Sequence, residues 1–147
     1  MQSRLLIRFS SDAEIDHIGR GLVNRSLPKS QWTHAAHFAA ACWLLRHPTM
    51  NAERQLPGLI RAYNEATGVA NTDAGGYHET ITRASLRAAR AWLASRRDCA
   101  LYQAVNELLA SDYGRSDWLL LHWSKATLFS VAARRGWVEP DLRVLPF

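Results

Sequence analysis

The chain is poor in cysteine and has no long apolar run. Cys42 and Cys99 are its two cysteines, too far apart for a CxxC metal site and too few for a disulfide framework. No segment can span a bilayer, because His34, His37 and Arg46 interrupt or bound the most apolar stretch. The amino end also lacks the apolar core and cleavage site of a secretory signal. We therefore expect a cytoplasmic protein with no membrane partner.

No block of charge, repeat or low-complexity segment is present either. The net charge is +5 and the isoelectric point is near 9.8, but the arginines are spread out, several of them along one predicted helix. Such spacing is typical of a solvated helix face, so we do not expect nucleic acid as a partner. Hydrophobic residues make up 48% of the 147 residues, which predicts one globular domain over residues 1–147. Nothing indicates a nucleotide cofactor.

The most informative stretch is SQWTHAAHFAAACWLLRHP, residues 30–48. It predicts a buried helix, with Ser30 as its cap and Pro48 as its stop. A preceding helix is expected over residues 12–25, with Asp12 as its cap. Gly19 and Gly21 weaken that helix but permit close packing against a neighbour.

Further helices are expected over residues 51–67, 77–95 and 99–111, and a last one from Ser124 to Gly136. Pro57 predicts a kink or break in the helix that ends before Gly68. Asp98 is the expected cap of the helix CALYQAVNELLAS, residues 99–111. Residues 1–11 are expected to form a packed arm. The fold class is therefore all-α, a single-domain bundle of five to six helices arranged mostly up-and-down.

Three histidines are the candidate site. In an up-and-down bundle the helices over 30–48 and 77–95 run the same way, so His34, His37 and His78 lie at one end of the domain. Neutral imidazoles bind divalent transition metals such as zinc, iron or nickel, which predicts a metal site at these three residues. Glu79 is the candidate catalytic base, and His17 is a further candidate ligand.

Other observations keep alternatives open. An HxxH pair alone is a weak signal, and the same spacing fits histidines that are simply hydrogen-bonded. Helix amino ends favour an anion over a cation. Tyr63, Asn64, Tyr77 and Arg83 are expected to line the same pocket. The two hypotheses are a hydrolase-like metalloenzyme and a non-catalytic helical binding or scaffold module that holds a small anion. Whether the protein is an enzyme stays open, and so does the question of whether it forms a homodimer.

Three stretches, WTHAAHFAAACWLL, RAYNEATGVANTDAGGYHETITR and SKATLFSVAARRGWVEPDL, resemble a family of small uncharacterised bacterial proteins. The resemblance covers roughly residues 30–142 and implies that His34, His37 and His78 act together, although it implies no established activity. WSKATLF stands where a more polar YSxxxLF pattern is expected. A weaker similarity, at the level of the fold, is to DinB-type helical bundles, which carry a three-histidine metal site with a different spacing.

Overall fold

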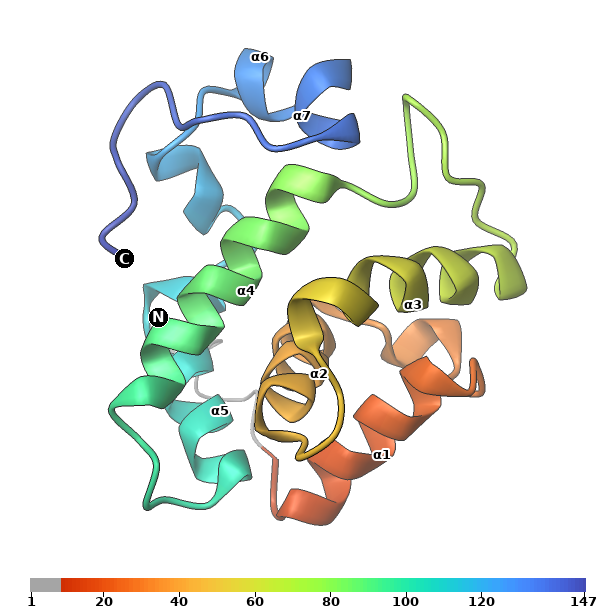
Figure 1. The fold of residues 1–147 in the computed structure, drawn as a ribbon, viewed down its shortest axis with the longest axis vertical. Helices are drawn as coiled ribbons and strands as arrows, with labels where there is room; N and C mark the ends of the chain where they lie inside the picture. The colour runs from red at the N-terminus through yellow and green to blue at the C-terminus, as the bar shows by residue number, and fades with distance from the viewer. Residues whose placement is uncertain (1–8) are drawn as a thin grey trace.

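The computed structural model describes residues 9–147 and folds them into helices, with no strand in that part of the chain (Figure 1). The prediction of an all-α, single-domain bundle is confirmed. The α-helices are α1 (Asp12–Val23), α2 (His34–Arg46), α3 (Ala52–Ala66), α4 (Glu79–Ala94), α5 (Leu101–Ala110), α6 (Lys125–Leu128) and α7 (Val131–Arg135). Short 3₁₀ turns, η2 (Lys29–Gln31), η3 (Asp112–Gly114) and η4 (Trp118–Leu121), join some of them.

Helix α2 is central and contacts α1, α3, α4 and α5 (Figure 1). Its alanines let neighbouring helices approach closely while burying apolar surface on several sides. The predicted cap is wrong by three residues, because Ser30 lies within η2 and the Thr33 hydroxyl accepts the hydrogen bond from the Ala36 amide. The helix ends at Arg46, two residues before Pro48, as expected.

The contact between α1 and α2 depends on glycine. A Cβ atom added at Gly19 would overlap the Trp43 indole, and one added at Gly21 would lie 2.9 Å from the Leu27 Cβ. The predicted close packing at these glycines is thus confirmed. Asp12 does not cap α1; its carboxylate instead accepts a hydrogen bond from the Tyr102 amide in the first turn of α5 (2.8 Å).

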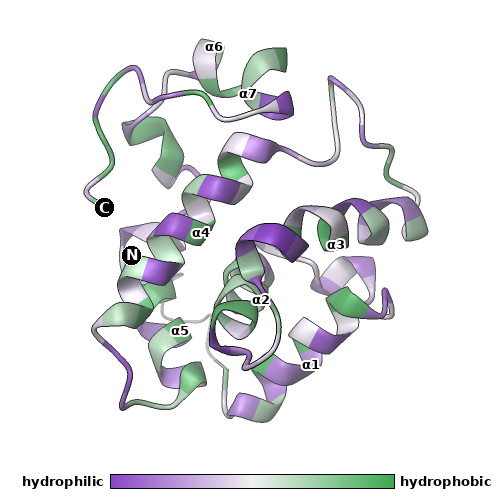
Figure 2. Ribbon diagram, in the orientation of Figure 1, coloured by the Kyte–Doolittle hydropathy of each residue, from purple (hydrophilic) through white to green (hydrophobic). Residues whose placement is uncertain are grey.

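Helix α3 continues through Pro57, so of the expected kink or break the break is absent. It ends at Ala66, and Gly68 follows with a φ of 86° that L side chains rarely adopt. Figure 2 shows polar and apolar residues alternating along α3 and α4, which fits helices that bury one face.

The loop between α3 and α4 is built around the Asn71 side chain. Its Oδ1 accepts hydrogen bonds from the Asn64 side chain and the Tyr77 amide, both at 3.0 Å. Its Nδ2 donates to the Arg61 carbonyl at 3.1 Å. Gly76, with a φ of 80°, passes so close to Ala70 that a Cβ atom would lie 2.5 Å from the Ala70 carbonyl oxygen. This loop therefore delivers α4 to one defined position.

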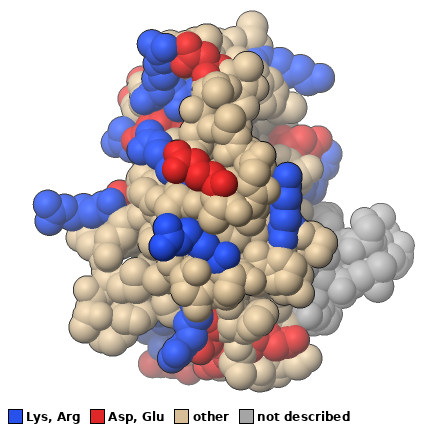
Figure 3. Space-filling model, turned by 90° about the vertical axis from the view of Figure 1, so that its right-hand side faces the viewer, with Lys and Arg blue, Asp and Glu red and all other residues tan. Residues whose placement is uncertain are grey.

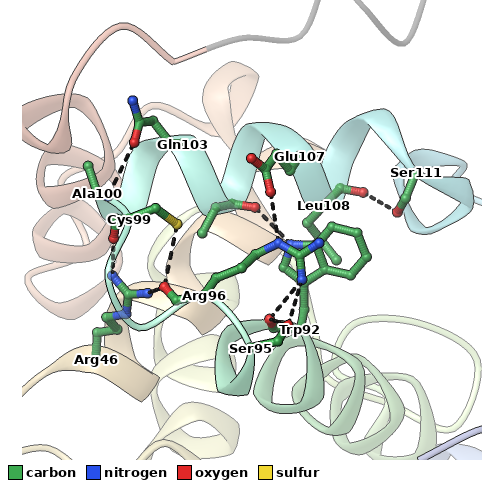
Figure 4. A network of polar contacts seen from close by, with 11 residues as sticks. Arg46, Trp92, Ser95, Arg96, Cys99, Ala100, Gln103, Glu107, Leu108 and Ser111 are labelled. Carbon is green, nitrogen blue, oxygen red and sulfur yellow. Dashed lines mark hydrogen bonds and ion pairs between the residues drawn. The ribbon is translucent and has the colours of Figure 1, made fainter.

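Two arginines brace the connection between α4 and α5 (Figure 4). Arg96 stacks on the Trp92 indole, 3.7 Å from its centroid, and its Nε donates to Glu107 at 2.8 Å. Arg46, from the end of α2, donates to the carbonyls of Cys99 (3.0 Å) and Arg96. The N-cap residue of α5 is Ala100, whose amide donates to the Gln103 side chain, so the expected Asp98 cap is wrong.

The carboxyl-terminal part covers the amino end of α4, where α7 contacts it (Figure 1). The single helix expected from Ser124 to Gly136 is divided into α6 and α7, because Ser130 caps a second start. At the other end of the chain, Phe9 and the Asn106 side chain exchange two hydrogen bonds (2.8 and 2.9 Å), and the rest of the predicted arm, residues 1–8, lies outside the described residues.

Basic and acidic side chains are interspersed on the face seen in Figure 3, over a mostly uncharged surface. Within the described residues, no helix is both long enough and apolar enough to cross a membrane.

Candidate functional site

A cavity of about 420 Å³ lies where α2, α3 and α4 meet the segment that contains η4 and α6. Its walls are mostly apolar, and a few polar side chains interrupt them. The size and composition are those of a small-molecule site. The lining residues are His34, His37, Phe38, Ala41, Leu56, Ile60, Ile81, Thr82, Ser85, Ser116, Asp117, Trp118, Leu119, Leu120, Leu128 and Phe129.

Two of the three predicted histidines line this cavity, and each is oriented by a backbone carbonyl. His37 Nδ1 bonds to the Thr33 carbonyl at 2.7 Å, and His34 Nε2 bonds to the Tyr113 carbonyl at 2.9 Å. A carbonyl only accepts, so the bonded nitrogen of each ring carries the hydrogen. In the neutral imidazoles the lone pairs are therefore on His37 Nε2 and His34 Nδ1, which have no protein partner among the described residues.

The surroundings of His37 favour its neutral form. His37 is an exposed residue of α2, and one side of its ring stacks on the Trp32 indole, with centroids 3.9 Å apart. Desolvation by the protein atoms around the ring lowers the pKa of His37 below its ordinary value, the bond to the Thr33 carbonyl raises it, and neighbouring His34 lowers it again. The net pKa is lowered, so at neutral pH this ring is a hydrogen-bond acceptor.

The remaining polar groups come from α4 and from the segment around η4. Thr82 and Ser85 lie one turn apart on α4, and Asp117 precedes η4. The Asp117 carboxylate pairs with Arg115 at 3.2 Å, and both side chains are more than half exposed, so the pair contributes little to stability. Among the described residues, no lysine or arginine lines the cavity. The arrangement therefore suits a neutral molecule better than an anion.

Trp118 stands out in the cavity wall. The residue is 2% exposed, and its indole Nε1 is buried without a hydrogen-bond partner. Its ring packs edge-on against Tyr113, with centroids 5.0 Å apart, and the Tyr113 carbonyl is the group that orients His34. Trp118 and His34 thus contact the same residue, one through its ring and the other through its backbone.

His78, the third predicted histidine, caps α4 instead of facing the cavity. Its Nδ1 accepts from the Ile81 amide at 3.2 Å, and its Nε2 donates to the Leu128 carbonyl at 2.7 Å. Both nitrogens are therefore occupied, and the residue is only 7% exposed. Burial lowers the pKa of His78 most, the bond to Leu128 raises it, and nearby Arg134 lowers it, with a net shift downward.

The arrangement of these histidines does not fit a three-histidine metal site. Within residues 9–147, no three His, Cys, Asp or Glu side chains are grouped so that they could hold a metal ion. His78 could bind a metal only by giving up a cap or a buried hydrogen bond, because a ligating nitrogen needs a free lone pair.

Glu79, the expected catalytic base, belongs to a different surface. Its carboxylate accepts a hydrogen bond from the Tyr77 hydroxyl at 2.7 Å and lies 3.9 Å from Arg83. Burial raises the pKa of Tyr77 most, and the hydrogen bond to Glu79 raises it further. The Arg61 guanidinium lies over the Tyr77 ring, 4.3 Å from the ring centroid. Glu79 and Arg83 line a separate cavity of about 300 Å³, and Tyr77 lines neither that cavity nor the main one.

The other expected pocket residues have structural partners. Tyr63 is fully buried and donates its hydroxyl to the Leu27 carbonyl at 2.8 Å, and Asn64 holds the Asn71 side chain. Neither lines the main cavity. His17 is exposed on α1 and lines another cavity, of about 430 Å³, together with Glu14.

Sequence reasoning missed Thr82, Ser85, Asp117 and Trp118. Thr82 and Ser85 are two small polar residues on an amphipathic helix, where they resemble any residues at the edge of its buried face. Trp118 begins an apolar run that favours burial but not an unpaired N–H group.

Comparisons of the chain with family models, with curated proteins and with solved structures found no match.

Proposed function

We propose that the protein binds a small, mostly apolar, neutral molecule in the cavity beside α2. The observation that carries this proposal is the pairing of apolar walls with two imidazoles whose orientation and tautomer are set by carbonyls. Such a site gains affinity from burial, and a few polar groups provide orientation. The ligand presents a hydrogen-bond donor to His37 Nε2.

The same geometry would allow the site to take a proton from a bound molecule. A neutral imidazole with one bare nitrogen in an apolar cavity can accept a proton as well as a hydrogen bond. If the protein is an enzyme, His37 is its general base and no step depends on Glu79. A small anion is less suited to the cavity, because none of the described residues that line it is a lysine or an arginine.

A matched pair of probe molecules tests whether the ligand donates a hydrogen bond to His37 Nε2. 5,6,7,8-Tetrahydro-2-naphthol carries a hydroxyl group, and its methyl ether has nearly the same body without the donor. One hydrogen bond contributes about 0.5–1.5 kcal/mol, so we expect the naphthol to bind about 2- to 12-fold more tightly in titration calorimetry.

His37→Phe keeps a ring against Trp32 but removes the nitrogen, and should abolish this preference while both probes still bind. His17→Phe is the control, since it alters an exposed histidine outside the cavity. Failure of both probes to bind, or an unchanged preference in His37→Phe, would refute the proposal.

We also retain the cytoplasmic location expected from the sequence as part of this proposal. Cys42 and Cys99 are free thiols, which fits a reducing compartment.

A further inference from the structure

Ser85 is a polar residue within the buried face of α4. The residues one turn before it, Ile81 and Thr82, line the cavity together with Ser85, and those one turn after it, Ala88 and Ala89, are buried. The exposed arginines of α4 lie on the other side of the helix. The part of Ser85 that stays accessible therefore faces the cavity and not the outer surface.

The Ser85 hydroxyl has no hydrogen-bond partner among the described residues. A hydroxyl on a helix can donate to the carbonyl four residues before it, as Thr67 does to the Tyr63 carbonyl at 2.9 Å, but no such bond is present at Ser85 in this part of the chain. The buried, unpartnered side-chain nitrogen and oxygen atoms of the described residues are Trp118 Nε1 and Arg134 Nε. Ser85 Oγ is not one of them, so a molecule in the cavity can reach it.

Several other side-chain donors of the cavity wall are already in use. The N–H groups of His34 and His37 donate to carbonyls, and the Thr82 hydroxyl is hydrogen-bonded to the Tyr77 side chain. Within the described residues, no lysine or arginine lines the cavity. Acceptors, in contrast, are available at the bare nitrogens of both histidines.

Two further donors in the wall are unsuitable for other reasons. Trp118 Nε1 is buried so completely that a ligand cannot reach it. Ser116 is exposed, so water can bond to its hydroxyl and a ligand gains little by replacing that water. Ser85 thus provides a partly buried and reachable donor that the fold itself does not use.

We infer that the ligand of this cavity carries an oxygen that accepts a hydrogen bond from Ser85 Oγ, in addition to the hydroxyl group that donates to His37 Nε2. This inference rests on the proposed function, to which it adds a second polar group held by a second helix. The ligand class is a neutral, mostly apolar hydroxy-ketone, because a ketone oxygen is an acceptor that brings no charge. Polar contacts on α2 and on α4 then give the ligand one orientation in an otherwise apolar cavity.

The test compares 5,6,7,8-tetrahydro-2-naphthol with 6-hydroxy-2-tetralone, which has the same rings and hydroxyl group and adds a ketone oxygen. The ketone is not conjugated with the hydroxyl group, so the donor strength of that group changes little. We expect the wild-type protein to bind the hydroxy-ketone about 2- to 12-fold more tightly in titration calorimetry, the range for one hydrogen bond. In Ser85→Ala this preference should disappear while both probes still bind. Ser30→Ala removes an exposed hydroxyl outside the cavity and should keep the preference.

Two further measurements do not depend on affinity. Ser85→Ala should be at least as stable as the wild-type protein in urea denaturation, because the hydroxyl has no partner in the fold and alanine has the higher helix propensity. With 6-hydroxy-2-tetralone labelled with ¹³C at its carbonyl, the bound resonance should lie further downfield in the wild-type protein than in Ser85→Ala. A hydrogen bond to the oxygen withdraws electron density from the carbonyl carbon.

The outcomes separate the inference from the proposed function. If the naphthol binds and the wild-type protein shows no preference for the hydroxy-ketone, or Ser85→Ala retains that preference, the inference is overturned and the binding site stays intact. A Ser85→Ala protein that is unfolded or less stable than the wild type shows that the fold uses the hydroxyl, and also overturns it. Failure of both probes to bind refutes the proposed function, and the inference with it.

Discussion

Replacing His78 should destabilise the protein even though the residue lies outside the cavity. His78→Ala removes the acceptor that caps α4, which costs about 1 kcal/mol. It also leaves the buried Leu128 carbonyl without its 2.7 Å donor, which costs about 1–3 kcal/mol. We expect a loss of about 2–4 kcal/mol in the free energy of unfolding, measured by urea denaturation followed by circular dichroism.

Two further variants separate the components of this effect. His78→Asn retains a capping acceptor but cannot reach Leu128, so it should lose only the second component, about 1–3 kcal/mol. His17→Ala changes an exposed histidine and should stay within about 0.5 kcal/mol of the wild-type protein.

The metal hypothesis predicts a different result for the same proteins. Stoichiometric zinc, iron or nickel in protein purified without a histidine tag, together with metal-dependent stabilisation that His78→Ala abolishes, would refute the assignment of His78 as a cap. A His78→Ala protein as stable as the wild type would refute it as well.

Three other measurements follow from the structure. The lowered pKa of His78 means that protonation favours the unfolded chain, so its contribution to stability should be full above pH 6.5 and fall below it, by at most about 1.4 kcal/mol per pH unit, in pH-dependent urea denaturation. His78→Asn should make this fall less steep, and the part that remains comes from His37, whose pKa is also lowered. Gly19→Ala should lower the melting temperature because a methyl group overlaps an indole on α2, whereas Gly58→Ala, in open space within α3, should stabilise by about 0.5–1 kcal/mol in thermal denaturation. Arg46→Lys loses the two-carbonyl geometry at the α4–α5 connection and should cost about 1–2 kcal/mol in urea denaturation, with exposed Arg54→Lys as the control.

The helical framework was predictable because local signals decide it. Alanine-rich segments, Pro48 and Gly68 mark helices and their ends through backbone sterics alone. The close approach at Gly19 was also predictable, since a small residue in a helix permits contact. Pro57 does not break α3, because a proline in the second turn of a helix disturbs few hydrogen bonds and the rest of α3 buries enough apolar surface to continue.

The site was only partly predictable. A polar residue before a helix can be a cap or a ligand, and the sequence is the same in both cases. His78 was expected in the first turn of its helix, but it lies one residue earlier, where its ring turns back onto the Ile81 amide. That shift of one residue removes it from any set with His34 and His37, because a capping nitrogen is no longer a free ligand.

The two histidines of the cavity differ in how far they depend on the fold. His37 bonds to the carbonyl four residues before it, so its tautomer follows from helical spacing and from the ring alone. His34 bonds to the Tyr113 carbonyl, 79 positions away, and is oriented only when the segment around η3 and η4 closes against α2. That same segment brings Trp118 into the wall. The acceptor at His37 is therefore a local property of the THxxH stretch, whereas the orientation of His34 and the place of Trp118 in the wall arise together from one long-range contact.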